Sequence, residues 1–320
     1  MFHEIAVEPT AIRTLRDVQL VLGLAGFSKG RVIADYPTEP KKAGSENVGW
    51  ASRVVESIKT MDIGKAPKVR ELLIKEKKRF SRSGRPFDEK LAWIANAKGE
   101  HARNPFAALI LDGPTTEACE CNLDDFLGDD YPECLKEDQH VQPLPKRPEE
   151  FAEHLLPMLR CACSLQFVDP HYLYVHRADG SLRLSSKHAR VAQEIARRMH
   201  GFNRVPRTVE FHTLQTSDYP ANELRYFISR MKDQLPQSWR AKAFLWHEKH
   251  GGKRFHARYI LTDVGGIGSE YGLDEGKSAA DETDLYLLPE PLCVKRTADF
   301  SEAGDTFVLA TAPLEFSGTR

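Results

Sequence analysis

Hydrophobic and polar positions repeat with two different periods along this chain, and the change of period predicts strands and helices in alternation. Ser164–Asp169 and Thr208–Leu214 are short apolar runs, which are typical of buried strands. Between them, Ser186–His200 repeats apolar residues every three or four positions, which predicts an amphipathic helix. Alternating helices and strands favour an α/β fold in which helices flank a mixed sheet.

The end of the chain adds further predicted strands. Lys242–His247 and Phe255–Asp263 are apolar runs on either side of Lys249–Lys253 (KHGGK), and this pattern predicts a β-hairpin. Asp284–Leu288 and Thr306–Ala310 are two more strand candidates.

The first half of the chain shows the same mixture. His3–Glu8, Arg31–Tyr36 and Pro105–Leu111 have the composition of strands. Leu15–Leu24 and Lys65–Phe80 have helical spacing, and the second of these predicted helices carries a basic outer face. We therefore predict a smaller mixed α/β domain ahead of the larger one.

A proline-rich stretch predicts the domain boundary. Val141–Glu150 (VQPLPKRPEE) has three prolines in ten residues, which is typical of a linker. The acidic, turn-rich stretch 112–138 precedes it and predicts a surface loop. We place the boundary near residue 145, between domains 1–145 and 146–320.

Composition restricts the class of protein. The chain has 320 residues, of which 41% are hydrophobic and 28% charged, as expected for about two globular domains in water. No run of about 18 uncharged apolar residues occurs, so a membrane-spanning helix is not expected. The start of the chain, MFHEIAVEPT, lacks the features of an export signal. Six cysteines are too few for a disulfide scaffold, so we expect a cytoplasmic protein with reduced thiols.

Charge is unevenly distributed despite a formal net charge of −1. Residues 1–110 hold 20 Lys and Arg against 13 Asp and Glu, whereas residues 111–140 hold 1 against 10. A basic segment beside an acidic one is typical of a face that binds polyanions, and two solvated surfaces are the alternative. The candidate contacts with a nucleic-acid backbone are Lys75, Lys77, Lys78 and Arg79.

The strongest candidate chemistry lies in Lys253–Asp274 (KRFHARYILTDVGGIGSEYGLD). His256 and Arg258 are two residues apart in a predicted strand and therefore face the same side. An imidazole beside a permanent guanidinium suits a phosphate group, because the imidazole can attack phosphorus and the guanidinium can bind two oxygens. Asp263 could orient the histidine, and amides of the glycine-rich turn before Ser269 could cradle an anion.

This segment resembles the phospholipase D-like phosphodiesterases, whose motif is His-x-Lys-x4-Asp followed by Gly-Ser. Here the motif is His256-x-Arg258-x4-Asp263, and Gly268-Ser269 follows after a shorter gap. The Gly-Leu-Asp triplet at 272–274 makes it more similar to the phospholipase D-like domain found C-terminal to microtubule-interacting-and-transport modules, and to prokaryotic relatives of that domain. The resemblance covers about residues 150–320.

The resemblance implies a fold and a mechanism for the C-terminal domain. It implies that His256 attacks phosphorus and forms a phosphohistidine, while Arg258 holds the nonbridging oxygens and Asp263 and Ser269 support them. Such chemistry needs no metal and no cofactor. The prokaryotic relatives imply an anti-phage setting.

The family also uses a second histidine as an acid, and several residues are candidates for that role or for substrate contact. Asp169 ends a predicted strand, where ligand contacts gather in sheets with parallel strands, and a simple Asp-Pro turn is the alternative. Each histidine has a packed, hydrogen-bonded position as its alternative role. The candidates are Asp169, His101, His171, His212 and His247, together with His256 of a second copy in a homodimer.

A zinc site is the remaining alternative. Cys119, Cys121, Cys134 and His140 are close in sequence. The usual spacing of zinc-binding cysteine pairs is Cys-x2–4-Cys, whereas this pair is Cys-x-Cys inside an acidic loop. We therefore predict no metal site.

Two functional hypotheses follow. The first is a metal-independent phosphodiesterase, a nuclease that acts on nucleic acid. The second is a binding module that holds a phosphate-bearing ligand or nucleic acid without cleaving it, within a complex with a protein partner.

Overall fold

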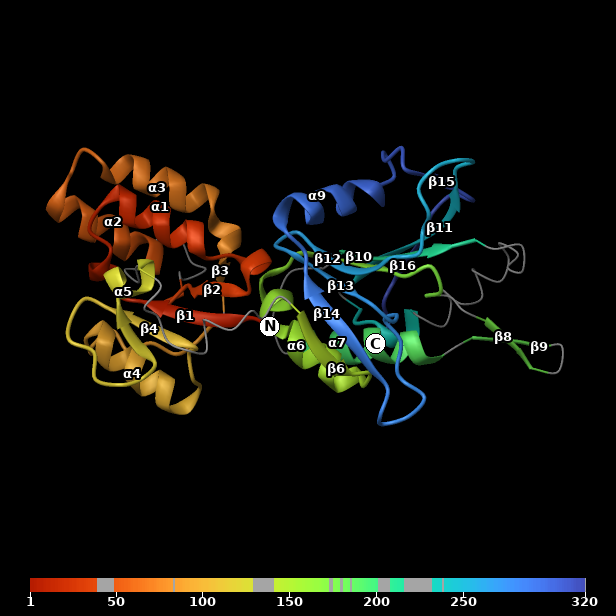
Figure 1. Cartoon of the computed structure of the whole chain (residues 1–320), viewed down its shortest axis with the longest axis horizontal. Helices are drawn as coiled ribbons and strands as arrows, with labels where there is room; N and C mark the ends of the chain where they lie inside the picture. Colours follow the sequence, from red (N-terminus) through yellow and green to blue (C-terminus); the bar gives the residue numbers. More distant parts are fainter. Residues whose placement is uncertain are drawn as a thin grey trace. The chain divides into compact units, whose positions relative to one another are not determined.

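The computed structural model describes residues 1–38, 49–82, 84–128, 141–172, 175–178, 181–184, 186–200, 208–215, 232–237 and 239–319 (Figure 1). The chain divides into two compact units, Met1–His140 (unit 1) and Val141–Arg320 (unit 2). Each unit contains a β-sheet with helices packed against it, so the predicted α/β class is confirmed.

The sheet of unit 1 is parallel throughout and has the strand order β3-β2-β1-β4-β5. Its strands are β1 (His3–Val7), β2 (Arg31–Ala34), β3 (Phe80–Ser81), β4 (Ala108–Leu111) and β5 (Glu120–Asn122). The helices of this unit are α1 (Leu15–Leu24), α2 (Trp50–Met61), α3 (Ala66–Lys75), α4 (Trp93–Arg103) and α5 (Leu123–Leu127). Parallel pairing brings the carboxyl ends of these strands to one edge of the sheet.

Alternation along β1 explains how both faces of this sheet are covered. Ile5 and Val7 belong to the core that α1, α2 and α3 cover, whereas Ala6 packs with Trp93 of α4. Successive strand residues point to opposite faces, so a strand covered on both faces is apolar throughout.

The sheet of unit 2 is mixed and has the order β15-β11-β10-β7-β12-β13-β14-β6, with β16 also paired to β11. Its strands are β6 (Val141–Pro145), β7 (Ser164–Val168), β10 (Thr208–Leu214), β11 (Arg240–Glu248), β12 (Arg258–Thr262), β13 (Gly266–Ser269), β14 (Glu282–Leu287), β15 (Phe307–Leu309) and β16 (Leu314–Ser317). A separate ribbon contains β8 (Val175–Ala178) and β9 (Ser181–Leu184). β7, β10 and β11 run parallel to one another.

Helices lie on both faces of this sheet. Figure 1 shows α9 (Glu290–Asp299) on one side and α6 (Pro148–Cys161) and α7 (Ser186–His200) on the other. Tyr259 and Leu261 of β12 share an apolar cluster with Cys293 of α9. The residues of β12 that point to the α9 side are thus fixed by packing.

The hairpin predicted around Lys249–Lys253 is wrong, because β11 and β12 are not neighbours. β11 pairs with β10 and β12 pairs with β7, so two strands separate them. The segment 249–257 therefore runs from the carboxyl end of β11 to the carboxyl end of β7. This connection carries His256 along the edge at which the parallel strands end.

Two further expectations need correction. Val141–Glu150 is not a linker, because its first residues form β6 and Pro148 begins α6. Proline is tolerated in β6 because this strand lies at the edge of the sheet. The glycine-rich segment is not an open turn either, since Gly266–Ser269 is a strand paired to β12 and β14.

Two predicted elements of unit 1 also differ in extent. The helix expected over residues 65–80 ends at Lys75, and a 3-10 turn, Lys77–Arg79, leads into β3. The acidic stretch expected as a loop contains β5 and α5, and its residues 129–138 lie outside the described residues.

Candidate anion-binding site

Three of the sequence-predicted site residues meet where β7 ends and β12 begins. Tyr259 pairs with Val168, so Arg258 lies beside Asp169, which directly follows β7. Arg258 also pairs with Ser269 at the end of β13. The register of the sheet therefore brings Asp169, Arg258 and Ser269 to one edge.

The Arg258 guanidinium is positioned by backbone groups and keeps an unused donor. Its Nη1 donates to the carbonyl oxygens of His256 and Glu270, at 3.3 Å each. Its Nε lies 3.9 Å from Oδ2 of Asp169 and is buried without a hydrogen bond. An unpaired buried N–H costs about 1–3 kcal/mol. The rest of the guanidinium is partly exposed, so its outer donors are the ones that an anion could reach.

Asp169 anchors the architecture of this edge. Its side chain is 1% exposed, and its two oxygens accept hydrogen bonds from the backbone N–H of His171 at 2.8 Å and of Leu273 at 3.0 Å. The carboxylate therefore joins the turn after β7 to the Gly-Leu-Asp triplet. It also places a negative charge next to Arg258, which leaves the guanidinium partly neutralised.

The Gly-Leu-Asp triplet is fixed in a conformation that only its glycine allows. Gly272 has a φ of +72°, and a Cβ there would lie 2.7 Å from Oδ1 of Asp274. Lys146 donates to that oxygen at 2.6 Å and to the carbonyl of Tyr271 at 2.7 Å. These contacts hold the backbone of the triplet in place beside Asp169.

Ser269 and the glycines of β13 have structural roles. The Ser269 hydroxyl is buried, donates to the Gly272 carbonyl at 3.1 Å and shares a hydrogen bond with Thr283 at 3.0 Å. A Cβ on Gly268 would overlap the Tyr286 ring. Gly268 therefore allows the ring of β14 to pack on β13, and its backbone belongs to a strand rather than to an anion cradle.

Asp263 directly follows β12, so it lies at the opposite end of that strand from Arg258. Its Oδ1 accepts hydrogen bonds from the backbone N–H of Cys163 at 2.8 Å and of Ser164 at 3.2 Å, where β7 begins. Five residues along a strand span about 17 Å, so the structure does not bring this carboxylate to His256. His256 precedes β12 and Asp263 follows it, so the two residues lie near opposite ends of the strand.

His256 and His171 are both exposed at the edge that Arg258 occupies. His256 directly precedes β12, and within the described residues its imidazole makes no hydrogen bond. His171 follows Asp169 by two residues in the turn after β7. Two histidines therefore accompany the Arg258–Asp169 pair.

His212 is a core residue, not an open acid. It is 0% exposed, stacks on Phe244 with ring centroids 4.6 Å apart, and its Nδ1 accepts from Trp246 Nε1 at 3.1 Å. Its Nε2 lies 3.3 Å from Glu210 Oε2. Burial lowers the pKa of His212 more than the neighbouring Glu210 raises it, so the imidazole is neutral.

The other two candidate histidines lie on β11, which β10 and β7 separate from β12, and in unit 1. His247 is exposed on β11, opposite Val308 of β15. His101 lies in α4 of unit 1, where its Nδ1 accepts from the backbone N–H of Phe106 at 3.2 Å and its Nε2 lies 3.4 Å from Cys119 Sγ. Within unit 2, the structure does not pair His247 with Arg258.

The basic residues of unit 1 divide into two groups. Lys75, Lys77 and Lys78 are exposed around the end of α3. Arg79, in contrast, donates to the carbonyl oxygens of Leu22 at 3.0 Å and Ala25 at 3.1 Å, at the end of α1. Arg79 therefore fastens α1 to β3, and the three lysines are the residues open to a ligand.

The zinc alternative receives no support from the described part of the chain. Cys121 is buried, and burial raises the pKa of its thiol to about 12. Cys134 and His140 lie outside the described residues. Across the described ranges, no group of three His, Cys, Asp or Glu side chains is arranged to hold a metal ion.

Two residues of the edge were missed in the sequence. Lys146 lies in the proline-rich stretch and was hidden by its interpretation as a linker. Thr283, which receives hydrogen bonds from the Tyr271 N–H and shares one with Ser269, lies at the start of β14 and has no sequence signal of its own. Only the register of β13 and β14 reveals it.

Comparison with known proteins leaves the family open. No family model matches the chain, and a search of curated proteins finds no match. Among solved structures, the search finds TrmBL2, described as an archaeal chromatin protein with a novel mode of DNA binding, at 12% identity and a TM-score of 0.27. The alignment covers 80% of this chain and 87% of that one. A TM-score this low carries no argument about fold or function. Among the described residues, no helix is long and apolar enough to cross a membrane.

Proposed function

We propose that unit 2 binds a phosphodiester group of nucleic acid at the edge formed by Arg258, His256 and the turn after Asp169, and that it does so without cleaving the bond. The observation that carries this proposal is the partly exposed Arg258 guanidinium at the start of β12, two residues after the exposed His256. A guanidinium of this kind suits phosphate oxygens because its donors form a planar fork. A cytoplasmic location is part of the same proposal, because nucleic acid is a ligand of the cell interior.

The arrangement around His256 supports binding over turnover. A histidine nucleophile is usually oriented by a third group, and Asp263, the carboxylate expected in that role, caps the far end of β7. His212, one of the candidate acids, is buried in the core. Arg258 also has its charge partly balanced by Asp169, which suits a reversible contact.

The exposed lysines of unit 1 supply a second contact in this proposal. Lys75, Lys77 and Lys78 carry three positive charges on one short surface segment. Each phosphate that such side chains neutralise releases counterions, so binding weakens steeply as salt rises. These contacts attach to the backbone of the nucleic acid and read no sequence.

A second candidate function is metal-independent cleavage, which the exposure of His171 favours. In that reaction the His256 imidazole nitrogen attacks phosphorus, the bond to the leaving oxygen breaks, and His171 donates a proton to that oxygen. Water then attacks the phosphohistidine and releases His256. The two functions share one site and differ only in whether the bond breaks.

One assay separates them. Pure protein is incubated with end-labelled single- and double-stranded DNA and RNA, in EDTA and in Mg²⁺, and both binding and chain length are followed. We expect retained, uncut nucleic acid in every condition. Cleavage that survives EDTA and is lost in His256→Ala, with the thermal unfolding midpoint unchanged, would overturn the binding proposal in favour of the second candidate. Failure to bind any of the four substrates at low salt would overturn both.

A further inference from the structure

Unit 1 has a pocket of its own at the carboxyl edge of its parallel sheet. The pocket has a volume of about 420 Å³, within the range of small-molecule sites. Asp35, which follows β2, and Arg82, which follows β3, line it. In sheets with parallel strands, ligands bind in crevices at this end, where loops from neighbouring strands converge.

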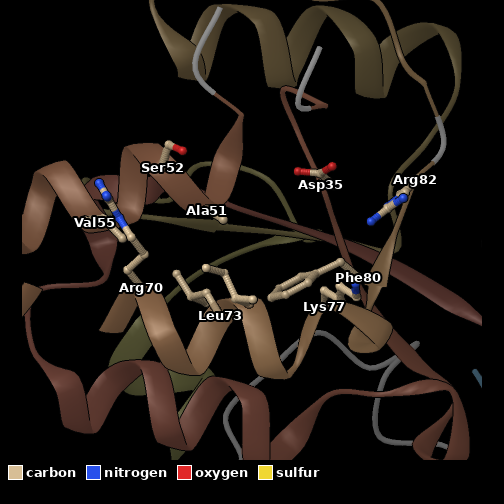
Figure 2. Close-up of a pocket in the computed structure, with 10 residues that line it drawn as sticks. Asp35, Ala51, Ser52, Val55, Arg70, Leu73, Lys77, Phe80 and Arg82 are labelled. Atoms are coloured by element: carbon tan, nitrogen blue, oxygen red, sulfur yellow. The ribbon is translucent and has the colours of Figure 1, made fainter. Parts of the chain in front are cut away.

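The walls of the pocket come from two helices and the turn between α3 and β3. α2 contributes Ala51 and Ser52, α3 contributes Arg70 and Leu73, and the turn contributes Lys77. Figure 2 shows that Arg70 lies at one end of the pocket and that Lys77 and Arg82 lie at the other. Cationic groups therefore stand at both ends.

The floor between these cations is apolar and partly aromatic. Figure 2 shows the Phe80 ring and Leu73 between Arg70 and Arg82. Phe80 is held there by Trp50, whose ring centroid lies 5.3 Å away. Because Trp50 and Phe80 are both buried in the core, packing fixes the orientation of the Phe80 ring.

The electrostatics of the pocket favour an anion. Among the described residues that line the pocket, three are cationic (Arg70, Lys77 and Arg82) and one, Asp35, is a carboxylate. The pocket also adjoins the first turn of α2. The N-cap residue of that helix is Gly49, so no side chain of the N-cap residue caps the helix. The positive end of the α2 dipole therefore adds to the field of the three cations.

These features together define the chemistry of the ligand. The cations need phosphate or a comparable anion, and the Phe80–Leu73 floor needs a flat apolar body. Asp35 and Ser52 can form hydrogen bonds with hydroxyl or amino groups between them. We propose that this pocket binds a nucleoside phosphate, with the phosphate at the cations and the base on the Phe80–Leu73 floor. This site is separate from the phosphodiester-binding edge of unit 2.

Calorimetric titration of the full chain tests the proposal with ATP, AMP, adenosine and inorganic phosphate as probes. We expect ATP or AMP to bind at least about tenfold more tightly than adenosine or phosphate alone, because both parts of the pocket are then filled. Arg70→Glu should weaken that binding at least about tenfold, whereas Lys68→Glu, exposed on the same helix but outside the pocket, should change it less than about twofold. Thermal unfolding midpoints of both variants confirm that they fold.

Three outcomes would overturn the proposal. The first is the absence of measurable binding heat with ATP or AMP at about millimolar concentration, because the proposed site should have a Kd below that concentration. The second is an equal loss in Lys68→Glu and Arg70→Glu, which would indicate diffuse charge attraction. The third is tighter binding of a short oligonucleotide that depends on Arg70, which would assign the pocket to a nucleic-acid surface. Repeating the titrations in Arg258→Ala removes any contribution of the unit 2 site to the heat, so the test is independent of the function proposed for unit 2.

Discussion

The Nε of Arg258 lies 3.9 Å from the Oδ2 of Asp169, where β12 begins beside the end of β7. That distance is too long for a hydrogen bond and short enough for strong charge attraction. The Asp169 oxygens accept hydrogen bonds from the backbone N–H groups of His171 and Leu273. The pair therefore combines a buried, fixed carboxylate with a partly exposed guanidinium.

Asp169→Asn should destabilise the protein. Both carboxylate oxygens accept from backbone N–H groups, and an amide would point its NH₂ at one of them. The free energy of unfolding in urea should fall by about 1–3 kcal/mol. Asp284→Asn on β14 is a matched control and should change it by less than about 0.5 kcal/mol. Equal effects of the two substitutions would refute the anchoring role of Asp169.

Gly268→Ala should also destabilise unit 2, because its new methyl group would overlap Tyr286. We expect a loss of about 1–3 kcal/mol, typical of an overpacked core. The same substitution at Gly23, in α1 with open space around it, should stabilise by about 0.5–1 kcal/mol. In a Tyr286→Ala background the Gly268→Ala penalty should shrink, and an unchanged penalty in that double-mutant cycle would contradict the packing explanation.

The buried His212 predicts a dependence of stability on pH. Burial holds the pKa of His212 below its ordinary 6.5, so the unfolded chain binds this proton better than the native state does. The stabilising contribution is complete above pH 6.5 and is lost as the pH falls through the window below it. The free energy of unfolding should therefore drop more steeply between about pH 6.5 and 5 in the native protein than in His212→Gln. Glutamine keeps an acceptor for Trp246 and does not titrate, so parallel pH profiles would rule this explanation out.

Arg79 and Lys78 are adjacent in sequence but should behave differently. Arg79→Ala removes hydrogen bonds to the Leu22 and Ala25 carbonyls and should cost about 1–3 kcal/mol of unfolding free energy. Lys78→Ala should cost less than about 0.5 kcal/mol and weaken nucleic-acid binding instead. Chemical denaturation and a binding titration of the two variants separate these roles, and a reversed pattern would contradict the assignment.

Local patterns predicted elements well but not how they pair. Ser186–His200 was predicted with its exact bounds, because its apolar spacing is regular. α4 was missed because its buried face includes Asn96 and Glu100, which a hydrophobic pattern does not detect. The predicted hairpin failed because KHGGK describes a turn and gives no information about which strands adjoin.

The candidate site was predicted in part for the same reason. Arg258 and Asp169 meet because β12 pairs with β7, a contact between residues about ninety positions apart that no local pattern predicts. Asp263 does not join them, since the length of β12 separates it from Arg258. The role of Gly268 also needed the structure, because its neighbour Tyr286 comes from another strand.

Binding of a fluorescently labelled single-stranded oligonucleotide, followed by anisotropy at low salt, tests the central claim most directly. Arg258→Ala should raise the Kd by about tenfold or more, the value of a charge-assisted hydrogen bond to phosphate. Arg240→Ala removes an exposed arginine from the start of β11, at the opposite end of the parallel strands from Arg258. This substitution should change the Kd by less than about twofold. Equal Kd values for the native protein and Arg258→Ala would contradict the account.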